Sequence, residues 1–352
     1  MKRILFALAL AFAGTSLNAV ETLSVGTPEL QSISALAFGP DGLLFVGDPL
    51  GGKIVAIDTG DSKPVDKGEA KFEKLDGSIA ELLGTKASDI AINDVKVNPA
   101  SGRIYAAVTR KGKDGGSLIV RIGRDQKIEE FKLKDVKHAV SKLPNASEKQ
   151  KQLAITSLAY ADGKLIVAGL SNEEFASTLR TIKVPFESTD RGTAIEIYHA
   201  AHGAKETRSP IQTLVPYTVG KADYIIASYT CTPLVRIPIS DLKPGDKVTG
   251  TTVAELGNMN RPLDIVVYSK DNKDYAFMSN SARGLMKIDL SNFEKADALT
   301  TPVKGGGTAG ISFDKVESAT GVKQLDRLDD KHAIVLVEEK DKSLSLKTIE
   351  LP

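Results

Sequence analysis

The chain has no tryptophan and one cysteine, Cys231, among its 352 residues. A single cysteine cannot form an internal disulfide, so buried apolar surface and strand pairing must hold the fold together. Neither sign of charge is in excess, because 46 basic residues face 45 acidic ones. This balance gives no electrostatic reason to expect nucleic acid or an anionic membrane as partner. The lack of tryptophan argues against a carbohydrate-stacking site, although the eight tyrosines leave that site open.

Long apolar runs are also scarce, and the one near the N-terminus is too short to cross a bilayer, which needs ~20 apolar residues. The run from Ile4 to Ala13 follows two cations, and Leu17-Asn18-Ala19 is typical of a signal peptidase site. We therefore expect residues 1–19 to be a signal peptide and the mature protein to be periplasmic or secreted. An N-terminal anchor that is not cleaved is the alternative.

The remaining segment, residues 20–352, is expected to form one domain of repeating units. Its length, about 330 residues, exceeds the ~250 to 300 at which a single core usually stops growing, so the choice lies between two domains and a repeat. The hydrophobic fraction of 41% and the charged fraction of 26% are ordinary for a folded chain. They exclude a disordered or collagen-like protein.

A β-type unit occupies Ile33–Asp58. Three apolar runs are separated by a Pro-Asp-Gly turn and by Gly51-Gly52, which predicts three strands of an antiparallel meander. A polar run at Lys71–Lys74 is predicted as the fourth, outer strand. The helical patterns are a short one at Ser78–Leu83 and a charged one near Asp135–Lys151.

The same succession of apolar runs and turns recurs five times, and the first strands of these units begin near Asp94, Ile155, Ile211, Pro262 and Gly310. A run near Leu299–Val303 is predicted as the fourth strand of the fifth unit, whereas the sixth unit has none. We expect Glu21–Val25 to pair with Leu344–Leu351 and close a ring. The prediction is a six-bladed β-propeller of four-stranded antiparallel blades. A pair of β-sandwiches or a solenoid is the alternative.

Two stretches, Phe38–Asp58 and Ile92–Val108, resemble the repeats of the NHL and gluconolactonase-like six-bladed propellers. That superfamily includes calcium-dependent lactonases and lyases of the streptogramin type. The resemblance implies a metal-binding Glu at the first inner strand, an Asn at the third and an Asp at the fifth. In this sequence the region of the first inner strand, Gln31–Ser34, has no carboxylate, and the region of the third has Thr156 and Ser157 in place of an Asn. Asp264 is the one residue that matches the expected ligands. The lactonase metal ligands are therefore largely missing, since calcium takes six or more oxygens.

A propeller brings the starts of its inner strands together at a central channel. If the units superpose as predicted, these starts carry Ser34, Asn93, Asp94, Ser157, Gln212, Asp264 and Gly310. Asp94 and Asp264 are then expected to face one channel, where two carboxylates can bind a cation or share a proton. The alternative is that each accepts a backbone N–H at the start of its strand.

The loops between second and third strands are predicted to lie on the same face, with Tyr229 and Arg283 as further ligand-binding candidates. His202, Glu206 and Cys231 are candidate ligands for zinc or copper, since imidazole and thiolate suit both metals. His199 and His202 would point to opposite sides of an extended strand, so one of them serves unless the strand has turned. The alternative is a polar loop with Cys231 as a small buried residue.

Three functions follow from these patterns. The first is a propeller that binds a small molecule, a metal or a protein at the loop face of its channel. The second is a cation-dependent enzyme of lactonase, lyase or quinoprotein type that uses Asp94 and Asp264. The third is a copper-handling protein that uses Cys231 and His202. The cofactor is unknown, with calcium, zinc and copper as the options, and the protein is expected to be a monomer without nucleic acid partners or a membrane span.

Overall fold

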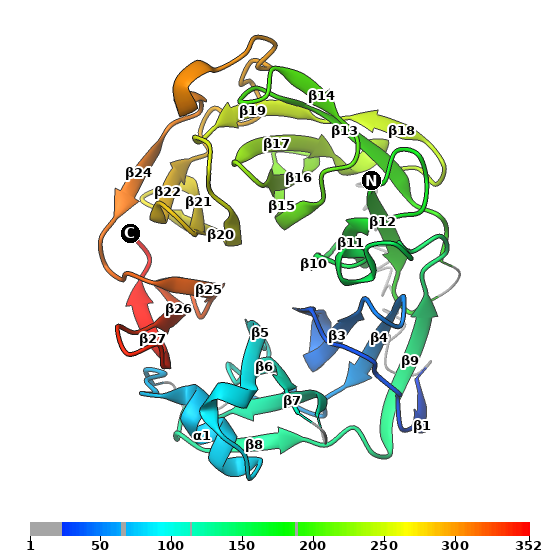
Figure 1. Ribbon diagram of the computed structural model, residues 1–352, viewed down its shortest axis with the longest axis vertical. Coiled ribbons are helices and arrows are strands. Elements are labelled where there is room, and N and C mark those ends of the chain that lie inside the picture. The colour runs from blue at the N-terminus through cyan, green and yellow to red at the C-terminus, as the bar shows by residue number, and fades with distance from the viewer. Residues whose placement is uncertain (1–22, 65–67, 113–114, 187–188) are drawn as a thin grey trace, which may run out of the picture.

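A computed structural model describes residues 23–64, 68–112, 115–186 and 189–352. Within these ranges the chain is almost entirely β, and small antiparallel sheets stand around a central axis as the six blades of a propeller, as predicted (Figure 1). The predicted signal peptide, residues 1–19, lies outside the described residues. No helix in the described part of the chain is long and apolar enough to span a membrane.

Blades 2 and 3 are meanders of consecutive strands, at the positions that the sequence indicates. Blade 2 consists of β5 (Ile90–Val97), β6 (Ile104–Arg110), β7 (Gly116–Ile122) and β8 (Ile128–Phe131). Blade 3 consists of β10 (Ser157–Ala161), β11 (Lys164–Leu170), β12 (Ser177–Lys183) and β13 (Thr193–His199), with β14 (Ala204–Glu206) and β18 (Lys247–Thr249) at its outer edge.

Blades 4, 5 and 6 follow in order along the chain. Blade 4 consists of β15 (Ile211–Val219), β16 (Ala222–Tyr229), β17 (Pro233–Pro238), β19 (Thr251–Glu255) and β23 (Ala309–Gly310). Blade 5 consists of β20 (Pro262–Lys270), β21 (Lys273–Asn280), β22 (Gly284–Asp289) and β24 (Phe313–Val316). Blade 6 consists of β25 (Val322–Arg327), β26 (His332–Glu338) and β27 (Leu344–Glu350).

Blade 1 takes its outer strand from a distant part of the sequence. It consists of β2 (Ala35–Phe38), β3 (Leu43–Asp48), β4 (Lys53–Asp58), β9 (Val136–Lys142) and β1 (Ser24–Gly26). The helices are α1 (Leu75–Leu82), η2 (Pro40–Gly42), η3 (Ala87–Asp89), η4 (Lys151–Leu153), η5 (Ile239–Asp241) and η6 (Lys304–Gly306). The short helix predicted at Ser78–Leu83 is therefore confirmed by α1, whereas the charged helix predicted near Asp135–Lys151 is wrong.

Each blade packs between two neighbours, so its middle strands are largely buried on both faces and are mostly apolar. All six residues of β3, for example, are buried. Separate apolar clusters fill the spaces between adjacent blades, including one between blades 1 and 2 and another between blades 2 and 6. These interfaces supply the burial that a chain without disulfides needs.

The assignment of strands to blades 5 and 6 differs from the prediction. Strand β24, which includes most of the run from Gly310, is the outer strand of blade 5 and pairs with β22. The run near Leu299–Val303 is not a strand. The inner strand of blade 6 is β25 instead, so Gly310 does not begin an inner strand. The sequence alone did not show this shift, because Gly310–Val316 and Val322–Arg327 both alternate apolar and polar residues over a similar length.

The blades do not follow one another around the ring in chain order. The inner strand β2 touches β10 on one side and β5 on the other, and β5 also touches β25. Blade 2 therefore lies between blades 1 and 6, and the ring runs in the order 2, 1, 3, 4, 5, 6 (Figure 1). After blade 2 the chain returns along the outside of blade 1 as β9 and then enters blade 3.

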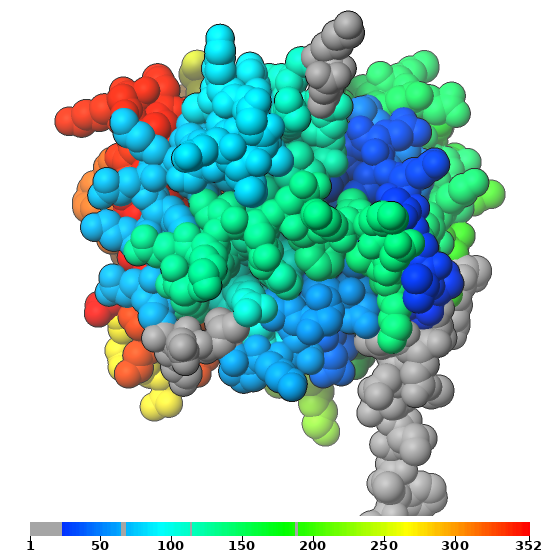
Figure 2. Space-filling view, turned by 90° about the horizontal axis from the view of Figure 1, so that it is seen from below, coloured from blue at the N-terminus to red at the C-terminus, as the bar shows by residue number. Residues whose placement is uncertain are grey.

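The predicted ring closure by the N-terminal strand is wrong. Strand β1 pairs with β9 at the rim of blade 1, and Figure 2 shows this blue segment on the opposite side of the molecule from the red C-terminal strands. The outer edge of β27 is covered instead by the segment predicted as the outer strand of blade 1. Phe72 and Leu346 exchange two backbone hydrogen bonds of 2.9 Å, and the N–H of Ala70 donates to Thr348. β4 pairs with β9, which leaves residues 70–74 available for blade 6.

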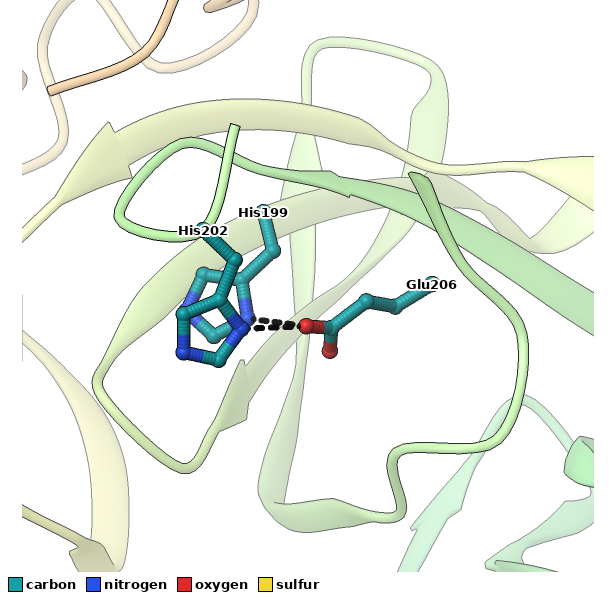
Figure 3. Close-up of side chains that lie close together, drawn as sticks. All are labelled: His199, His202 and Glu206. Carbon is teal, nitrogen blue, oxygen red and sulfur yellow. Dashed lines mark hydrogen bonds and ion pairs between the residues drawn. The ribbon is translucent and has the colours of Figure 1, made fainter. Parts of the chain in front are cut away.

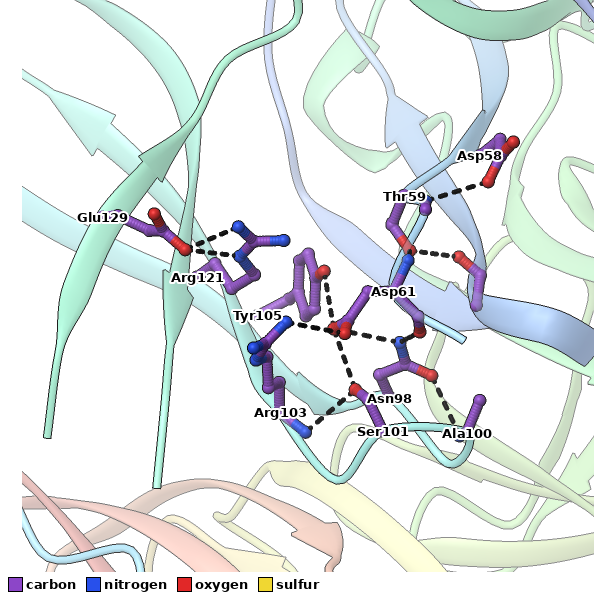
Figure 4. A network of polar contacts seen from close by, with 12 residues as sticks. Asp58, Thr59, Asp61, Asn98, Ala100, Ser101, Arg103, Tyr105, Arg121 and Glu129 are labelled. Carbon is purple, nitrogen blue, oxygen red and sulfur yellow. Dashed lines mark hydrogen bonds and ion pairs between the residues drawn. The ribbon is translucent and has the colours of Figure 1, made fainter. Parts of the chain in front are cut away.

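A polar network fastens blade 1 to blade 2 (Figure 4). Asp61, which follows β4, is buried and accepts hydrogen bonds from Ser101, Arg103 and Tyr105 on the β5–β6 hairpin, at 2.8, 2.8 and 3.0 Å. Burial and the negative charge of Asp61 raise the pKa of Tyr105 to about 12, so its hydroxyl remains a donor. The network holds together two blades that are neighbours in sequence and in space.

The closing segment generates the first prediction. Phe72 is 7% exposed and packs in the cluster between blades 2 and 6, so Phe72→Ala should lower the free energy of unfolding by about 3 kcal/mol. The neighbouring exposed Lys71 is the matched control, and Lys71→Ala should change it by less than about 0.5 kcal/mol. Urea unfolding measures both. Equal stability of the two variants would show that this segment does not hold the edge of blade 6.

Candidate functional site

A cavity of about 600 Å³ lies on the propeller axis. Its walls are the inner strands of the six blades, β2, β5, β10, β15, β20 and β25. The volume falls within the range of about 300 to 1,000 Å³ that is typical of small-molecule sites. We call this cavity the central channel.

Lys96 lies on the channel wall among three carboxylates. Its Nζ donates to Asp264 Oδ2 at 2.8 Å and is 3.3 Å from Asp94 Oδ1, while the charge of Asp326 acts on it as well. The lysine comes from blade 2, and Asp264 and Asp326 come from blades 5 and 6. Residues that are far apart in the sequence thus form one charged cluster, which we call the Lys96 cluster.

The same three carboxylates join neighbouring inner strands. Asp94 of blade 2 accepts from the N–H of Leu36 in blade 1 at 2.7 Å, and Asp326 of blade 6 accepts from the N–H of Val97 in blade 2 at 2.7 Å. Asp264 of blade 5 accepts from the N–H of Leu325 in blade 6 at 3.3 Å. The aspartates thus satisfy buried backbone donors that no strand pairing reaches, because the inner strands of adjacent blades are not partners in a sheet.

The cluster perturbs the titration of its members. Burial, assisted by the charges of Asp94 and Asp326 and opposed by Lys96, raises the pKa of Asp264 to about 7. Burial also raises the pKa of Asp326. For Lys96, burial would lower the pKa, but the surrounding carboxylates outweigh it and the pKa rises above its ordinary value. Lys96 therefore remains charged at neutral pH, whereas Asp264 can hold or release a proton there.

Several polar side chains on the channel wall make no side-chain hydrogen bond among the described residues, and Gln212 and Thr156 are two of them. Gln212 follows the first residue of β15, at an irregularity in the pairing with β16, and is half-buried. The hydroxyl of Thr156, just before β10, is fully buried and unpaired, which is uncommon inside proteins. Both side chains are suited to contact a bound molecule.

Four of the predicted ligand-binding residues line the channel, namely Asn93, Asp94, Gln212 and Asp264. The side-chain N–H groups of Asn93 already have partners, because Nδ2 donates to Ile33 O at 2.7 Å and to Thr109 at 2.8 Å. The alternative interpretation of Asp94 and Asp264, that each accepts a backbone N–H, is also confirmed. These backbone contacts leave both carboxylates on the channel wall, while their role in binding a cation or sharing a proton stays a prediction.

The structure does not place Arg283 and Tyr229 on the channel wall. The Arg283 guanidinium donates to Asn258 O at 3.4 Å and lies against Gly257, where a Cβ would come within 2.1 Å of Nη2. Tyr229 is buried in the apolar cluster between blades 3 and 4, and burial raises the pKa of its hydroxyl. The loops that carry them lie on the predicted face, but their side chains pack within the rim.

Lys96 and Asp326 are the channel residues that the sequence analysis missed. Lys96 lies two residues after Asp94, and period-two alternation places both on one face of the strand. Asp326 was missed because the inner strand of blade 6 was assigned to the wrong segment.

A second polar cluster lies at the end of β13 (Figure 3). The Nδ1 atoms of His199 and His202 are 3.0 and 2.5 Å from the same oxygen, Glu206 Oε1. Burial alone would raise the pKa of Glu206, but the neighbouring His199 and hydrogen bonds from Ser209 and His202 lower it to about 2. The carboxylate is therefore ionised at any ordinary pH.

The predicted metal set is thus brought together only in part. His202 and Glu206 are close, and His199 is the third member of the cluster, because the chain turns sharply after β13 and returns as β14. Cys231 is not a member. It lies half-buried in the turn between β16 and β17, and its N–H donates to Asn260 O at 2.8 Å.

Comparisons with known proteins show likeness of fold and no family. No protein-family model matches the chain, and no curated protein is similar in sequence. A Thermus thermophilus protein described as an oxidoreductase (glucose dehydrogenase) is 13% identical, with a TM-score of 0.39 over 93% of this chain and all of the other. Virginiamycin B lyase from Staphylococcus aureus is 10% identical, with a TM-score of 0.37 over 94% and 98%. An arabinanase from Bacillus subtilis is 12% identical, with a TM-score of 0.34 over 74% and 94%.

The raised pKa of Asp264 predicts a particular pH dependence of stability. Between its ordinary value of 3.8 and about 7, the folded protein holds a proton on Asp264 that the unfolded chain releases, so this group makes the free energy of unfolding fall as the pH rises. Asp264→Asn removes the titration. Relative to wild type, its stability should therefore rise steadily from pH 4 to pH 7 in urea unfolding.

The matched control is Asp271→Asn. Asp271 is exposed in the β20–β21 turn with φ of 52°, a conformation that asparagine tolerates. The free energy of unfolding of Asp271→Asn, plotted against pH, should therefore run parallel to that of wild type. A parallel profile for Asp264→Asn as well would contradict the raised pKa, whatever the absolute stability of the variant.

Proposed function

We propose that this protein binds a small, neutral or cationic organic molecule in the central channel. The observation that carries the proposal is the cavity of about 600 Å³ that holds the Lys96 cluster. A concave space of this size with a few convergent polar groups is the usual form of a small-molecule site. The unpaired Gln212 and Thr156 are the groups available to the ligand.

The balance of charge on the wall favours ligands that are not anionic. The acidic residues that line the channel are Asp94, Asp264, Asp326 and Asp329, and the basic ones are Lys96 and Arg327. Even with Asp264 protonated, carboxylates outnumber cations. A bound anion would face net repulsion, whereas an amine or a hydroxyl would meet acceptors.

The two ends of the channel differ in the side chains they present. Near the starts of the inner strands the wall carries the uncharged polar Thr156, Gln212 and Gln324, and towards their ends it carries the rings of Phe38 and Tyr160 together with the charged Arg327 and Asp329. A molecule with a hydroxyl-bearing or amine-bearing head and a partly apolar body matches this arrangement.

Lys96 argues against a divalent cation held by Asp94 and Asp264. Its ammonium group already lies within 3.3 Å of both carboxylates and supplies the positive charge that a metal ion would bring. This is the physical reason for preferring an organic ligand over the calcium that the lactonase resemblance implies. Kinship with the NHL and gluconolactonase-like propellers remains a proposal, which the motifs at Phe38–Asp58 and Ile92–Val108 support.

The second candidate function is an enzyme of lactonase or lyase type that works without a metal in the channel. One observation favours it: burial brings the pKa of Asp264 to about 7, where a carboxyl group can serve as general acid or base. Lys96, 2.8 Å away, would stabilise the ionised form. Both candidate functions use the same channel.

We also propose that the protein acts outside the cytoplasm. The support is the N-terminal sequence: two cations, the apolar run Ile4–Ala13 and the small residue Ala19.

Ligand binding is tested by thermal shift with three groups of probes: polyols and monosaccharides, primary and quaternary amines, and small carboxylic acids. Compounds of the first two groups should raise the melting temperature, and carboxylic acids should not. For a compound that binds, Gln212→Leu should weaken the affinity about tenfold, as expected for the loss of one hydrogen bond. Gln150→Leu, at an exposed position outside the channel, should leave it unchanged. No shift with any probe, or equal weakening by both variants, would contradict the proposal.

Export is tested by expressing residues 1–352 in a bacterium and determining the N-terminus by mass spectrometry. The mature chain should begin at Val20 and appear in the periplasm or the medium. Ala19→Arg should block cleavage, because signal peptidase needs a small residue there, whereas Asn18→Gln, at the tolerant position before it, should not. A cytoplasmic protein that begins at Met1 would refute the assignment.

A further inference from the structure

The turn after β13 forms a polar cluster that is separate from the central channel. His199 is the last residue of β13, and the chain turns through residues 200–203 before β14 pairs back onto β13. This turn brings His202 over His199, with ring centroids 4.0 Å apart and ring planes inclined by 35°. Glu206, at the end of β14, completes the cluster (Figure 3).

Three potential ligand atoms converge in this cluster. His199 Nδ1 and His202 Nδ1 both point at Glu206 Oε1, and all three atoms lie within 4.8 Å of one another. His199 Nδ1 is 3.0 Å from the carboxylate oxygen, but their alignment does not make a hydrogen bond. Two imidazole nitrogens directed at one oxygen are a poor hydrogen-bond arrangement, because that oxygen must serve both rings while its neighbour Oε2 accepts from Ser209.

Buried polar atoms without partners surround these three residues. His199 is 2% exposed, and neither of its ring nitrogens has a hydrogen-bond partner among the described residues. Glu255 is fully buried. Its Oε2 accepts from the N–H of Ala201 at 3.2 Å, while its Oε1 has no partner, and its charge acts on both histidines. An unpaired buried nitrogen or carboxylate oxygen is costly, so several in one place call for a further partner.

Charge leads to the same conclusion. Glu206 and Glu255 are two acidic side chains at one site, and within the described ranges no lysine or arginine forms an ion pair with either of them. Within that part of the chain, neither carboxyl group therefore has a lysine or arginine charge beside it. A divalent cation would supply positive charge there and occupy the imidazole nitrogen atoms at the same time.

We propose that His199, His202 and Glu206 bind a divalent transition-metal ion such as Zn²⁺, with Glu255 beside it. Two imidazole nitrogens and one carboxylate oxygen are ligands that zinc accepts, with a further position open to water or to Glu255. Cys231 takes no part. The site is independent of the ligand proposed for the central channel, because none of its residues lines that cavity.

The test is titration of the metal-free mature chain with Zn²⁺ in a calorimeter, followed by the visible absorption of Co²⁺ at the same site. We expect one ion per chain, and Co²⁺ bands that Zn²⁺ abolishes. His202→Ala and Glu206→Gln should each weaken Zn²⁺ binding by at least about 100-fold. His202 is the ligand to replace first, because its side chain is 54% exposed and its loss should leave the fold intact.

The matched control is His332→Ala. His332 is an exposed imidazole whose Nδ1 is 2.9 Å from a carboxylate oxygen of Asp329, so it reproduces the pairing without the converging second histidine. This variant and Cys231→Ser should bind Zn²⁺ as wild type does. Circular dichroism and melting temperature establish that each variant is folded. Failure of the wild-type chain to bind Zn²⁺, or equal affinity in wild type and His202→Ala, would overturn the proposal and leave a hydrogen-bonded polar hairpin.

Discussion

The attraction between Lys96 and the carboxylates of three blades is the interaction on which the middle of this propeller depends. The inner strands of adjacent blades belong to separate sheets and do not pair with one another, so side-chain contacts must join them at the axis. Here Asp94, Asp264 and Asp326 bridge those strands through backbone N–H groups, and Lys96 makes the burial of three negative charges tolerable. The same groups face the open channel, so the axis is stabilised by the residues that are best placed to meet a ligand.

The path of the chain shows how a ring of separate sheets is secured without disulfides. The outer part of blade 1 includes β9, which follows blade 2 in the sequence. The edge of blade 6 pairs with the segment around Phe72, which lies in the connection between blades 1 and 2. The segments that close the edges of blades 1 and 6 thus come from distant parts of the sequence. The hydrogen bonds and ion pair of Asp61 also join blades 1 and 2. After these two blades the chain passes back along blade 1 to reach blade 3.

Two polar sites of different character result. The central channel combines carboxylates with a permanent cation inside a cavity, which suits an organic molecule. The cluster of His199, His202 and Glu206 has carboxylates and imidazoles without a lysine or arginine in ion-pair contact, which suits a metal ion. Both sites contain aspartate or glutamate side chains. A neighbouring lysine favours an organic ligand in the channel, and the lack of one favours a metal ion beside the two histidines.

The amino-acid sequence by itself determined the class of fold and the number of blades, because alternating apolar runs separated by Gly, Pro and Asp turns are local signals. It also placed Asp94 and Asp264 at the axis, since each occurs at a recognisable start of an inner strand. Only the tertiary structure decided the order of the blades, the pairing of β1, the inner strand of blade 6 and the role of Lys96. These depend on which strand edges and charges meet across more than a hundred residues, and the local pattern of a strand does not specify its partner. For the same reason His199 replaced Cys231 beside His202: the sharp turn after β13, and not the spacing of the residues, brings the two imidazoles together.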